Sequence, residues 1–299
     1  MPYLSVKEIA GKWKISERSV RNYCQQGRIP GVTLIGKTWS IPDDAAKPER
    51  KGSVRTNVRT LDKVLKDEKT QAITGGIYHK VQIDLTYNSN HMEGSRLTHD
   101  ETRYIYETNT IGIHNKQINV DDIVETVNHF RCIDYIIEHC NQPLSEKMIK
   151  ELHMLLKAGT SDSRQSWFAV GDYKLLPNEV GGFETISPEN VHSHMKQLLT
   201  DYKEIVQPDL DTLLDFHVRF ERIHPYQDGN GRVGRLILFK ECLKHQIVPF
   251  IIEDSLKLYY YRGLSEWDLE KGFLRDTCLT AQDNMKKQLD YFRIPYKKM

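Results

Sequence analysis

The chain has 299 residues, of which 42 are Lys or Arg and 41 are Asp or Glu, so its formal net charge is +1. This length accommodates one large core and a small accessory domain. The five cysteines form no close pair, and no apolar run approaches the roughly 20 residues that span a bilayer. Disulfide-rich secreted proteins and membrane proteins are therefore excluded, and we expect a cytoplasmic protein with reduced thiols.

The first 59 residues differ from the rest in charge, with 12 Lys or Arg against 5 Asp or Glu. Ser5 and Ser16 are favourable N-cap residues, and they predict helices over Val6–Trp13 and residues 17–26. Alternating side chains over residues 32–41 predict a β-hairpin after the second helix.

Two short helices followed by a hairpin resemble the small winged helix-turn-helix of the MerR and excisionase type, over residues 1–45. The resemblance implies DNA binding, with Arg18, Arg21 and Asn22 presented by the second helix. A docking or dimerisation module with solvated basic residues has the same pattern, so both interpretations stay open. Residues 46–60 are rich in charge and are predicted to be a linker.

Helical periodicity resumes at residue 61, and a helix over residues 78–88 is expected to lead into Ser89 and Glu93. These two residues are four apart, hence on one helix face, and Gly94 can end the helix. Further helices are predicted over residues 98–107, 120–140, 145–156 and 191–206.

Residues 168–186 and residues 258–269 also have distinctive sequence patterns. Residues 168–186 carry few helix signals, and we predict a β-hairpin there. Residues 258–269 have helical periodicity and contain Tyr259, Tyr260 and Tyr261. Three consecutive tyrosines on a helix cannot all face one ligand, so at least one of them packs into the core.

Residues 224–235 read His-Pro-Tyr-Gln-Asp-Gly-Asn-Gly-Arg-Val-Gly-Arg and join two segments with helical periodicity. Gly229, Asn230 and Gly231 lie where the second helix begins. Free backbone N–H groups and the positive end of the helix dipole make this turn an anion site, and glycine lets the anion approach closely. A merely structural turn is the alternative, disfavoured because glycine loses the most entropy on folding.

The charged side chains of the motif indicate which anion binds. Asp228 can hold a divalent cation through oxygen, and Arg232 and Arg235 can fork onto phosphate oxygens, so ATP with Mg²⁺ fits. A calcium loop starting at Asp228 needs an acid where Phe239 stands. A Walker loop needs Lys and then Ser or Thr after Gly231, so both rival motifs are excluded.

This motif resembles the signature of the Fic family, His-x-Phe-x-Asp/Glu-Gly-Asn-Gly-Arg-x-x-Arg, with Tyr226 at the Phe position. The resemblance implies a mainly helical fold that moves AMP from ATP to a hydroxyl of a target protein. It implies that His224 is the general base and that Asp228 binds magnesium. The amides of residues 229–231 and the Asn230 side chain would hold the α phosphate.

By the same resemblance Arg232 and Arg235 hold the outer phosphates. Gly231 stands where family kinases carry Lys, which favours nucleotidyl transfer over phosphorylation. The chemistry agrees, because His can act as a base near neutral pH and transfer at phosphorus relies on positioning and charge stabilisation.

Ser89, Glu93 and Gly94 match the inhibitory segment of many Fic proteins, Ser/Thr-x-x-x-Glu-Gly/Asn. The resemblance implies that Glu93 pairs with Arg235 as a bidentate carboxylate, occupies the place of the γ phosphate and keeps the resting enzyme largely off. Some family members also remove AMP, with this Glu aligning a water, so the direction of the reaction stays open.

The resemblance also assigns roles to the two flanking segments. Residues 168–186 are the flap, which pairs with an extended target segment by strand addition, and Val180 is expected to border the nucleotide. A plain surface hairpin would have the same sequence pattern. Tyr260 or Tyr261 is expected to stack on adenine.

We therefore expect a mainly α fold, a Fic helical bundle with a β-hairpin flap, preceded by the small winged helix-turn-helix. The expected parts are that module (1–45), the linker (46–60), an inhibitory-helix region (61–110) and a catalytic domain (111–299). The expected function is an autoinhibited protein adenylyltransferase that uses ATP and Mg²⁺ on a Ser, Thr or Tyr hydroxyl. Alternatives are a DNA-binding regulator that senses nucleotide, or a Fic enzyme with another donor. The oligomeric state stays open, a homo-oligomer included.

Overall fold

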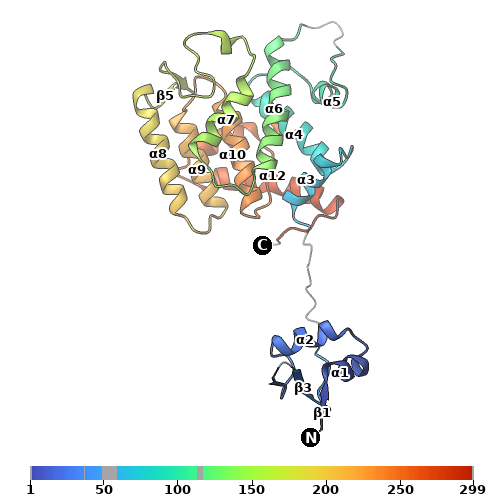
Figure 1. Cartoon of the computed structure of the whole chain (residues 1–299). Helices are drawn as coiled ribbons and strands as arrows, with labels where there is room; N and C mark the ends of the chain where they lie inside the picture. The colour runs from blue at the N-terminus through green and yellow to red at the C-terminus, as the bar shows by residue number, and fades with distance from the viewer. Residues whose placement is uncertain (1, 37, 49–58, 113–116, 298–299) are drawn as a thin grey trace. The chain divides into compact units, whose positions relative to one another are not determined.

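The computed structural model describes residues 2–36, 38–48, 59–112 and 117–297 (Figure 1). They belong to two compact units, Met1–Val58 and Arg59–Met299. Each unit has its own hydrophobic core. The predicted linker over residues 46–60 lies largely outside the described residues.

The first unit contains two helices and an antiparallel sheet. Its elements are β1 (Tyr3–Ser5), α1 (Val6–Trp13), α2 (Glu17–Gln25), β2 (Thr33–Ile35) and β3 (Thr38–Pro42). Ser5 and Ser16 cap the helices as predicted, since each accepts a hydrogen bond from a backbone N–H in the first turn. The predicted hairpin is β2 with β3, although Lys37 in its turn lies outside the described residues. Strand β1 was not predicted, and it pairs with the far edge of β3.

The second unit is a helical bundle, which confirms the mainly α fold class. Its helices are α3 (Leu61–Thr70), α4 (Ile77–Met92), α5 (His99–Thr108), α6 (Val120–Glu138), α7 (Glu146–Lys157), α8 (Pro188–Glu204), α9 (Leu210–Ile223), α10 (Asn230–Lys244), α11 (Lys257–Ser265) and α12 (Gly272–Tyr291). Short 3₁₀ turns occur at Asp162–Arg164 and Asp254–Leu256.

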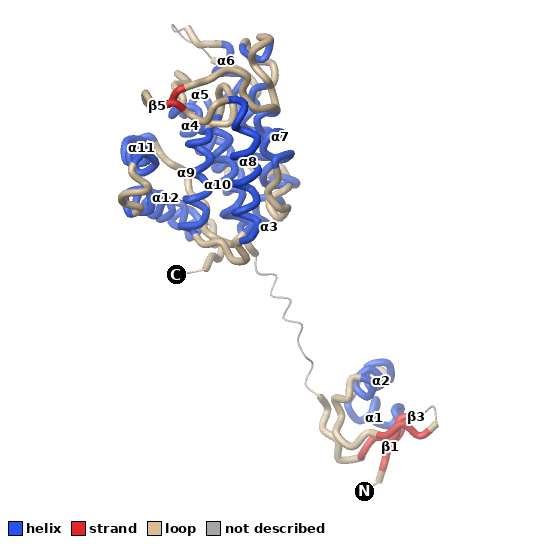
Figure 2. Tube along the Cα trace, turned by 90° about the vertical axis from the view of Figure 1, so that its left-hand side faces the viewer, coloured by secondary structure: helices blue, strands red, loops and turns tan. Residues whose placement is uncertain are grey.

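Helix α10 is the centre of this bundle. It packs against α9, α6, α7 and α4, and Figures 1 and 2 show it among these helices. Every residue from Arg232 to Leu243 is buried, as expected of a helix surrounded on all sides. Arg232 and Arg235 are thereby drawn into the interior, where a charge must be paired.

The hairpin that the sequence predicted over residues 168–186 is shorter than expected. Strand β4 (Glu179–Val180) pairs with β5 (Phe183–Glu184). Both turn residues, Gly181 and Gly182, have positive φ, 59° and 82°, which suits the tight turns that join paired strands. Residues 168–178 form turns and irregular chain instead of a strand.

The composition of the sequence predicted reduced cysteines and no membrane-spanning segment. All five cysteines are buried and free in the described part of the chain, as expected of reduced core residues. Across the described ranges, none of the helices combines the length and the apolar character needed to cross a bilayer.

Candidate active site

His224 ends helix α9 in the left-handed backbone region, with φ of 50° and ψ of 62°. Its Nδ1 lies 3.2 Å from the carbonyl oxygen of Glu221. Because a carbonyl oxygen only accepts, Nδ1 carries the proton and Nε2 keeps a free lone pair. Burial lowers the pKa of the imidazole, so it is neutral near pH 7. This is the state that a general base needs.

The loop after His224 is shaped by Asn230, whose side chain is 2% exposed. Its Oδ1 accepts a hydrogen bond from Tyr226 N, and its Nδ2 donates to Tyr226 O, both at 2.8 Å. In this structure the side chain therefore binds the loop backbone, and its contact with the α phosphate stays a prediction. Gly229 precedes α10 with φ of 83°, and the open N–H groups of this helix start remain as the anion site.

Arg235 is held by the end of helix α4. Its Nη2 donates to Glu93 Oε1 at 2.6 Å and to Ser89 O at 3.0 Å, while Nε donates to Ser89 Oγ at 3.0 Å. The predicted ion pair is thus present, but as a single contact instead of a bidentate one, with Ser89 accepting from Nε and also from Nη2. Burial would raise the pKa of Glu93, but Arg235 outweighs it and the pKa is lowered.

Gly231 makes this contact sterically possible. A Cβ at residue 231 would stand 2.4 Å from Glu93 Oε1 and 2.8 Å from Arg235 Nη1. Both are closer than non-bonded atoms approach, so a side chain here would push the carboxylate away. Gly231, where the sequence predicts close approach of a phosphate, also lets Glu93 lie over the start of α10.

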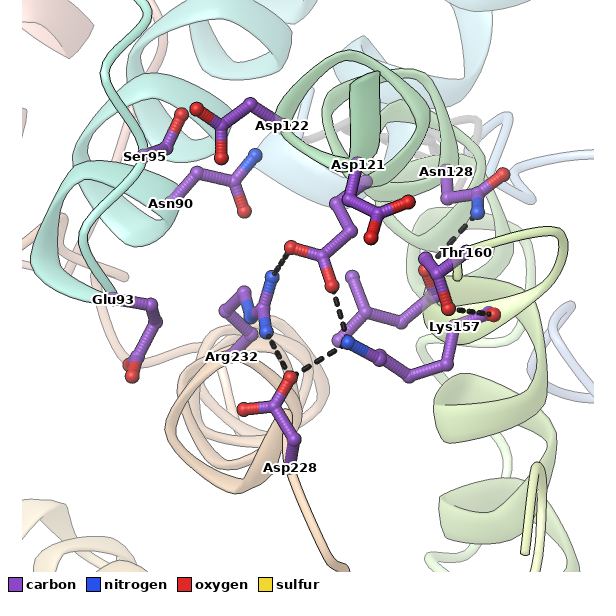
Figure 3. Close-up of polar contacts among 12 residues, drawn as sticks. Asn90, Glu93, Ser95, Asp121, Asp122, Asn128, Lys157, Thr160, Asp228 and Arg232 are labelled. Atoms are coloured by element: carbon purple, nitrogen blue, oxygen red, sulfur yellow. Dashed lines mark hydrogen bonds and ion pairs between the residues drawn. The ribbon is translucent and has the colours of Figure 1, made fainter. Parts of the chain in front are cut away.

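Arg232 and Asp228 belong to a network of alternating charges (Figure 3). Arg232 is 3% exposed; its Nη1 donates to Glu125 on α6, and its Nη2 to Asp228 Oδ2 at 3.0 Å. Lys157 on α7 donates to the same Oδ2 at 2.6 Å and also to Glu125. Two carboxylates and two cations compensate one another here, as buried charges require. Both terminal nitrogens of Arg232 therefore bind protein carboxylates in this structure, and its contact with the outer phosphates stays a prediction.

The geometry of Asp228 fits a magnesium ligand. Both cations bind Oδ2, and Figure 3 shows the other carboxylate oxygen pointing away from them. Burial acts in the opposite direction, but Arg232 and Lys157 lower the pKa of Asp228, so the carboxylate is ionised. Mg²⁺ is commonly bound by one or two carboxylates together with substrate phosphates and water. A carboxylate oxygen that neither cation binds, beside the predicted anion site, meets that requirement.

Glu125 and Lys157 were missed by sequence reasoning, although a signal existed. Each lies one helical turn from a buried histidine, Glu125 from His129 and Lys157 from His153. A charged residue on the buried face of a helix needs a partner of opposite charge. The pattern indicates that partners exist, but it does not tell which residues they are.

The three other residues that were predicted to contact the nucleotide, Tyr260, Tyr261 and Val180, differ in how far they are buried. Tyr260 is 1% exposed and its hydroxyl lies 2.6 Å from His217 Nε2, so it packs in the core and cannot stack on a nucleotide. Tyr261 is 39% exposed, and its hydroxyl donates to Met92 O at the end of α4. Val180 lies exposed on β4 of the hairpin. Tyr261 thus contacts the end of α4 next to Glu93, while the buried Tyr260 lies beside Arg235.

Comparison with known proteins identifies the motif-bearing segment. Residues 143–241 match the model of the Fic/DOC family. Protein adenylyltransferase fic-1 of Caenorhabditis elegans is 27% identical over 197 residues, covering 63% of this chain and 35% of that protein. Protein adenylyltransferase Fic of Culex quinquefasciatus is 24% identical over 253 residues, covering 82% and 46%. The chain thus spans about a third to a half of the length of these curated relatives.

Solved structures support the same fold. A Fic domain containing signaling protein from Bacteroides thetaiotaomicron has a TM-score of 0.57 at 24% identity, covering 77% of this chain and 90% of that one. A Fic family protein from Desulfovibrio desulfuricans has a TM-score of 0.58 at 21% identity, covering 75% and 69%. The matched segment includes the whole motif from His224 to Arg235, and the fold of this chain is similar to that of these solved Fic proteins.

Proposed function

We propose that this chain is a protein adenylyltransferase, which transfers AMP from ATP to a Ser, Thr or Tyr hydroxyl of a target protein. One observation carries the proposal: His224, with Nε2 free, precedes a glycine-rich helix start with an ionised carboxylate beside it. Relatives that share this motif-bearing segment are named protein adenylyltransferases.

In the proposed reaction, the target hydroxyl oxygen attacks the α phosphorus of ATP. Its proton passes to His224 Nε2, the new oxygen–phosphorus bond forms, and the bond to the β phosphate breaks to release pyrophosphate. The N–H groups at the start of α10 stabilise negative charge on the α phosphate. A magnesium ion held by Asp228 would neutralise charge on the phosphates.

The Glu93 contact makes the proposed resting state inactive. Glu93 places a negative charge on the guanidinium of Arg235, which the outer phosphates of ATP would otherwise occupy. A nucleotide bound beside this carboxylate would be displaced from the in-line geometry. Residues 168–186, with the short hairpin at their end, would hold the target by strand addition. Unpaired buried cysteines agree with a cytoplasmic setting for the reaction.

The test uses ATP labelled at the α or the γ phosphate, with Mg²⁺ and the full chain. We expect α label, and not γ label, on the protein itself or on added cell extract. Glu93→Gly should raise labelling more than about tenfold because it frees Arg235. Adding His224→Ala to Glu93→Gly should abolish it.

Glu266→Gly is a matched control, because Glu266 is the C-cap residue of α11 as Glu93 is of α4. It should label like the parent. Equal labelling of Glu93→Gly and parent, both folded, would contradict the proposal. Other α-labelled nucleotides and a phosphocholine donor belong in the same assay, and release of AMP from pre-labelled protein would indicate the reverse reaction.

A second function is favoured by the first unit, whose helix α2 exposes Arg18, Arg21 and Asn22. We propose that this face binds DNA. Affinity for duplex DNA should fall steeply as salt rises, and Arg18→Ala should lower the salt slope by about one. The control is Lys63→Ala, in the other unit. Salt-independent or absent binding would instead favour a docking module.

A further inference from the structure

Lys174 is a buried cation whose partners are neutral. Lys174 is 2% exposed. Its Nζ donates to Asn178 Oδ1 at 2.7 Å and to Thr185 Oγ1 at 2.5 Å. Among the described residues, no carboxylate forms an ion pair with it, whereas the buried Lys157 and Lys240 both have carboxylate partners. A buried charge without a counter-charge is costly, which favours a role beyond stability.

The partners of Lys174 lie at the two ends of the hairpin. Asn178 directly precedes β4 and Thr185 directly follows β5, and Thr185 N donates to Asn178 O at 3.3 Å. The ammonium group therefore closes the base of the hairpin that is proposed to hold the target.

The same residues attach the hairpin to the loop that carries His224. Lys174 N donates to Pro225 O at 2.9 Å, and Asn178 Nδ2 donates to Tyr226 O at 3.0 Å. Pro225 and Tyr226 directly follow His224. Lys174 and Asn178 thus connect the base of the hairpin to the residues that follow the proposed base, Lys174 through its backbone and Asn178 through its side chain.

The charge of Lys174 also reaches the imidazole. Burial lowers the pKa of Lys174 to about 8, so it is still charged where His224 titrates. The pKa of His224 is lowered first by burial and also by Lys174, against the Glu221 carbonyl and the carboxylates of Glu93 and Asp228. An unpaired cation nearby disfavours the imidazolium.

We infer that Lys174 is a positioning residue of the proposed transfer reaction, which fixes the target-binding hairpin against the catalytic loop and keeps His224 in its neutral form. The inference rests on the proposed function for its kinetic consequence. Its electrostatic consequence is independent of any activity, because the imidazole and the ammonium are both present without substrate.

The test compares Lys174→Met with Lys174→Arg in the Glu93→Gly chain. Met keeps the length of the side chain and removes the charge, while Arg keeps the charge. NMR titration of ring-labelled histidines, with the His224 signal assigned through His224→Ala, should show the pKa of His224 raised by roughly half a pH unit or more in Lys174→Met. Lys174→Arg should leave it unchanged. The acid limb of kcat/KM for AMP transfer should move by the same amount in the same direction.

Thr185→Val separates the two parts of the inference, since it removes one acceptor of Nζ and leaves the charge in place. It should raise KM for the target without moving the His224 titration. An unchanged His224 pKa in folded Lys174→Met would overturn the inference, and if that variant does not fold, Lys174→Gln provides the same measurement. Loss of the kinetic readout alone, with the NMR shift present, would contradict the proposed function instead.

Discussion

The two arginines of the motif are paired with carboxylates that differ in exposure and in their position along a helix. Arg235 is bound by Glu93, which is 29% exposed and lies at the end of a helix, whereas Arg232 is bound by Glu125, 14% exposed and inside α6. A helix end can move away at low cost, while an internal residue of a packed helix cannot. Under the proposed function we therefore expect phosphate to displace Glu93 from Arg235 more readily than Glu125 from Arg232, which also binds Asp228.

Glu221 is a second acid of this region, in an environment that disfavours its charge. Its side chain is 15% exposed, and within the described residues its Oε1 has no hydrogen-bond partner. Burial raises its pKa from 4.5 to about 8, partly opposed by Arg235. Glu221 is therefore protonated near pH 7 in the folded chain and ionised in the unfolded chain.

This shift predicts how stability depends on pH. A raised folded-state pKa stabilises the fold below the unfolded value of 4.5, and that stabilisation is lost as pH rises to about 8. Glu221→Gln, which is always neutral, should therefore be more stable than the parent at pH 8, by about 1 kcal/mol or more, and similar to it at pH 4. Urea denaturation at both pH values measures this. A constant difference between the two chains would show that the Glu221 carboxyl does not titrate as described.

At the scale of elements, hydrogen bonds between α4 and α6 set the position of Glu93. Gln82 Nε2 donates to Asp134 Oδ1 at 2.8 Å, and Thr86 Oγ1 lies 2.9 Å from His129 Nδ1 one turn further on. Such bonds are directional, so they fix how far α4 extends along α6 more strictly than apolar contacts do. This register brings the C-terminal end of α4 to Arg235.

Helix α11 contacts α12 at Gly263, and we expect that a larger residue at this position destabilises the fold. A Cβ at Gly263 would stand 2.6 Å from Leu274 Cα and 2.7 Å from Leu274 N. Backbone atoms cannot rotate away, so Gly263→Ala should destabilise the second unit by roughly 1–3 kcal/mol in denaturant unfolding.

Gly112→Ala is the control for this prediction, in the same unit. Among the residues that the structure describes, its Cβ would meet the Tyr104 ring alone, at an ordinary 3.7 Å. It should change the free energy of unfolding by less than about 0.5 kcal/mol. Equal effects of the two substitutions would indicate that the α11–α12 contact is looser than the structure shows.

At the scale of the whole molecule, each of the two units has its own hydrophobic core. We therefore expect each unit to carry out its proposed activity without the other. The core of the first unit is formed by residues between Val6 and Ile41, and the motif and its partners all lie in the second unit. A chain starting at residue 59 and carrying Glu93→Gly should therefore transfer AMP to added targets about as fast as the full Glu93→Gly chain. Loss of transfer in a truncated chain that keeps its helical circular dichroism would show that the first unit contributes to the reaction.

Sequence alone determined what depends on neighbouring residues. Ser5, Thr98 and Ser145 each cap a helix by accepting from a backbone N–H three residues later, so their helix starts follow from local hydrogen bonding. The glycine-rich helix start and its charged residues are likewise contiguous in the chain. That is why the order of residues was enough to recognise the motif and its proposed chemistry.

Only the tertiary structure decided which distant groups meet. Glu125 and Arg232 are 107 residues apart in sequence, and the partners of Lys174 reach the loop after His224 from another segment. Strand β1, the burial of Tyr260 and the inward turn of Asn230 also depend on packing. Helix periodicity says which face of a helix is buried, but not what lies against it, because that is set by how the whole bundle excludes water from its core.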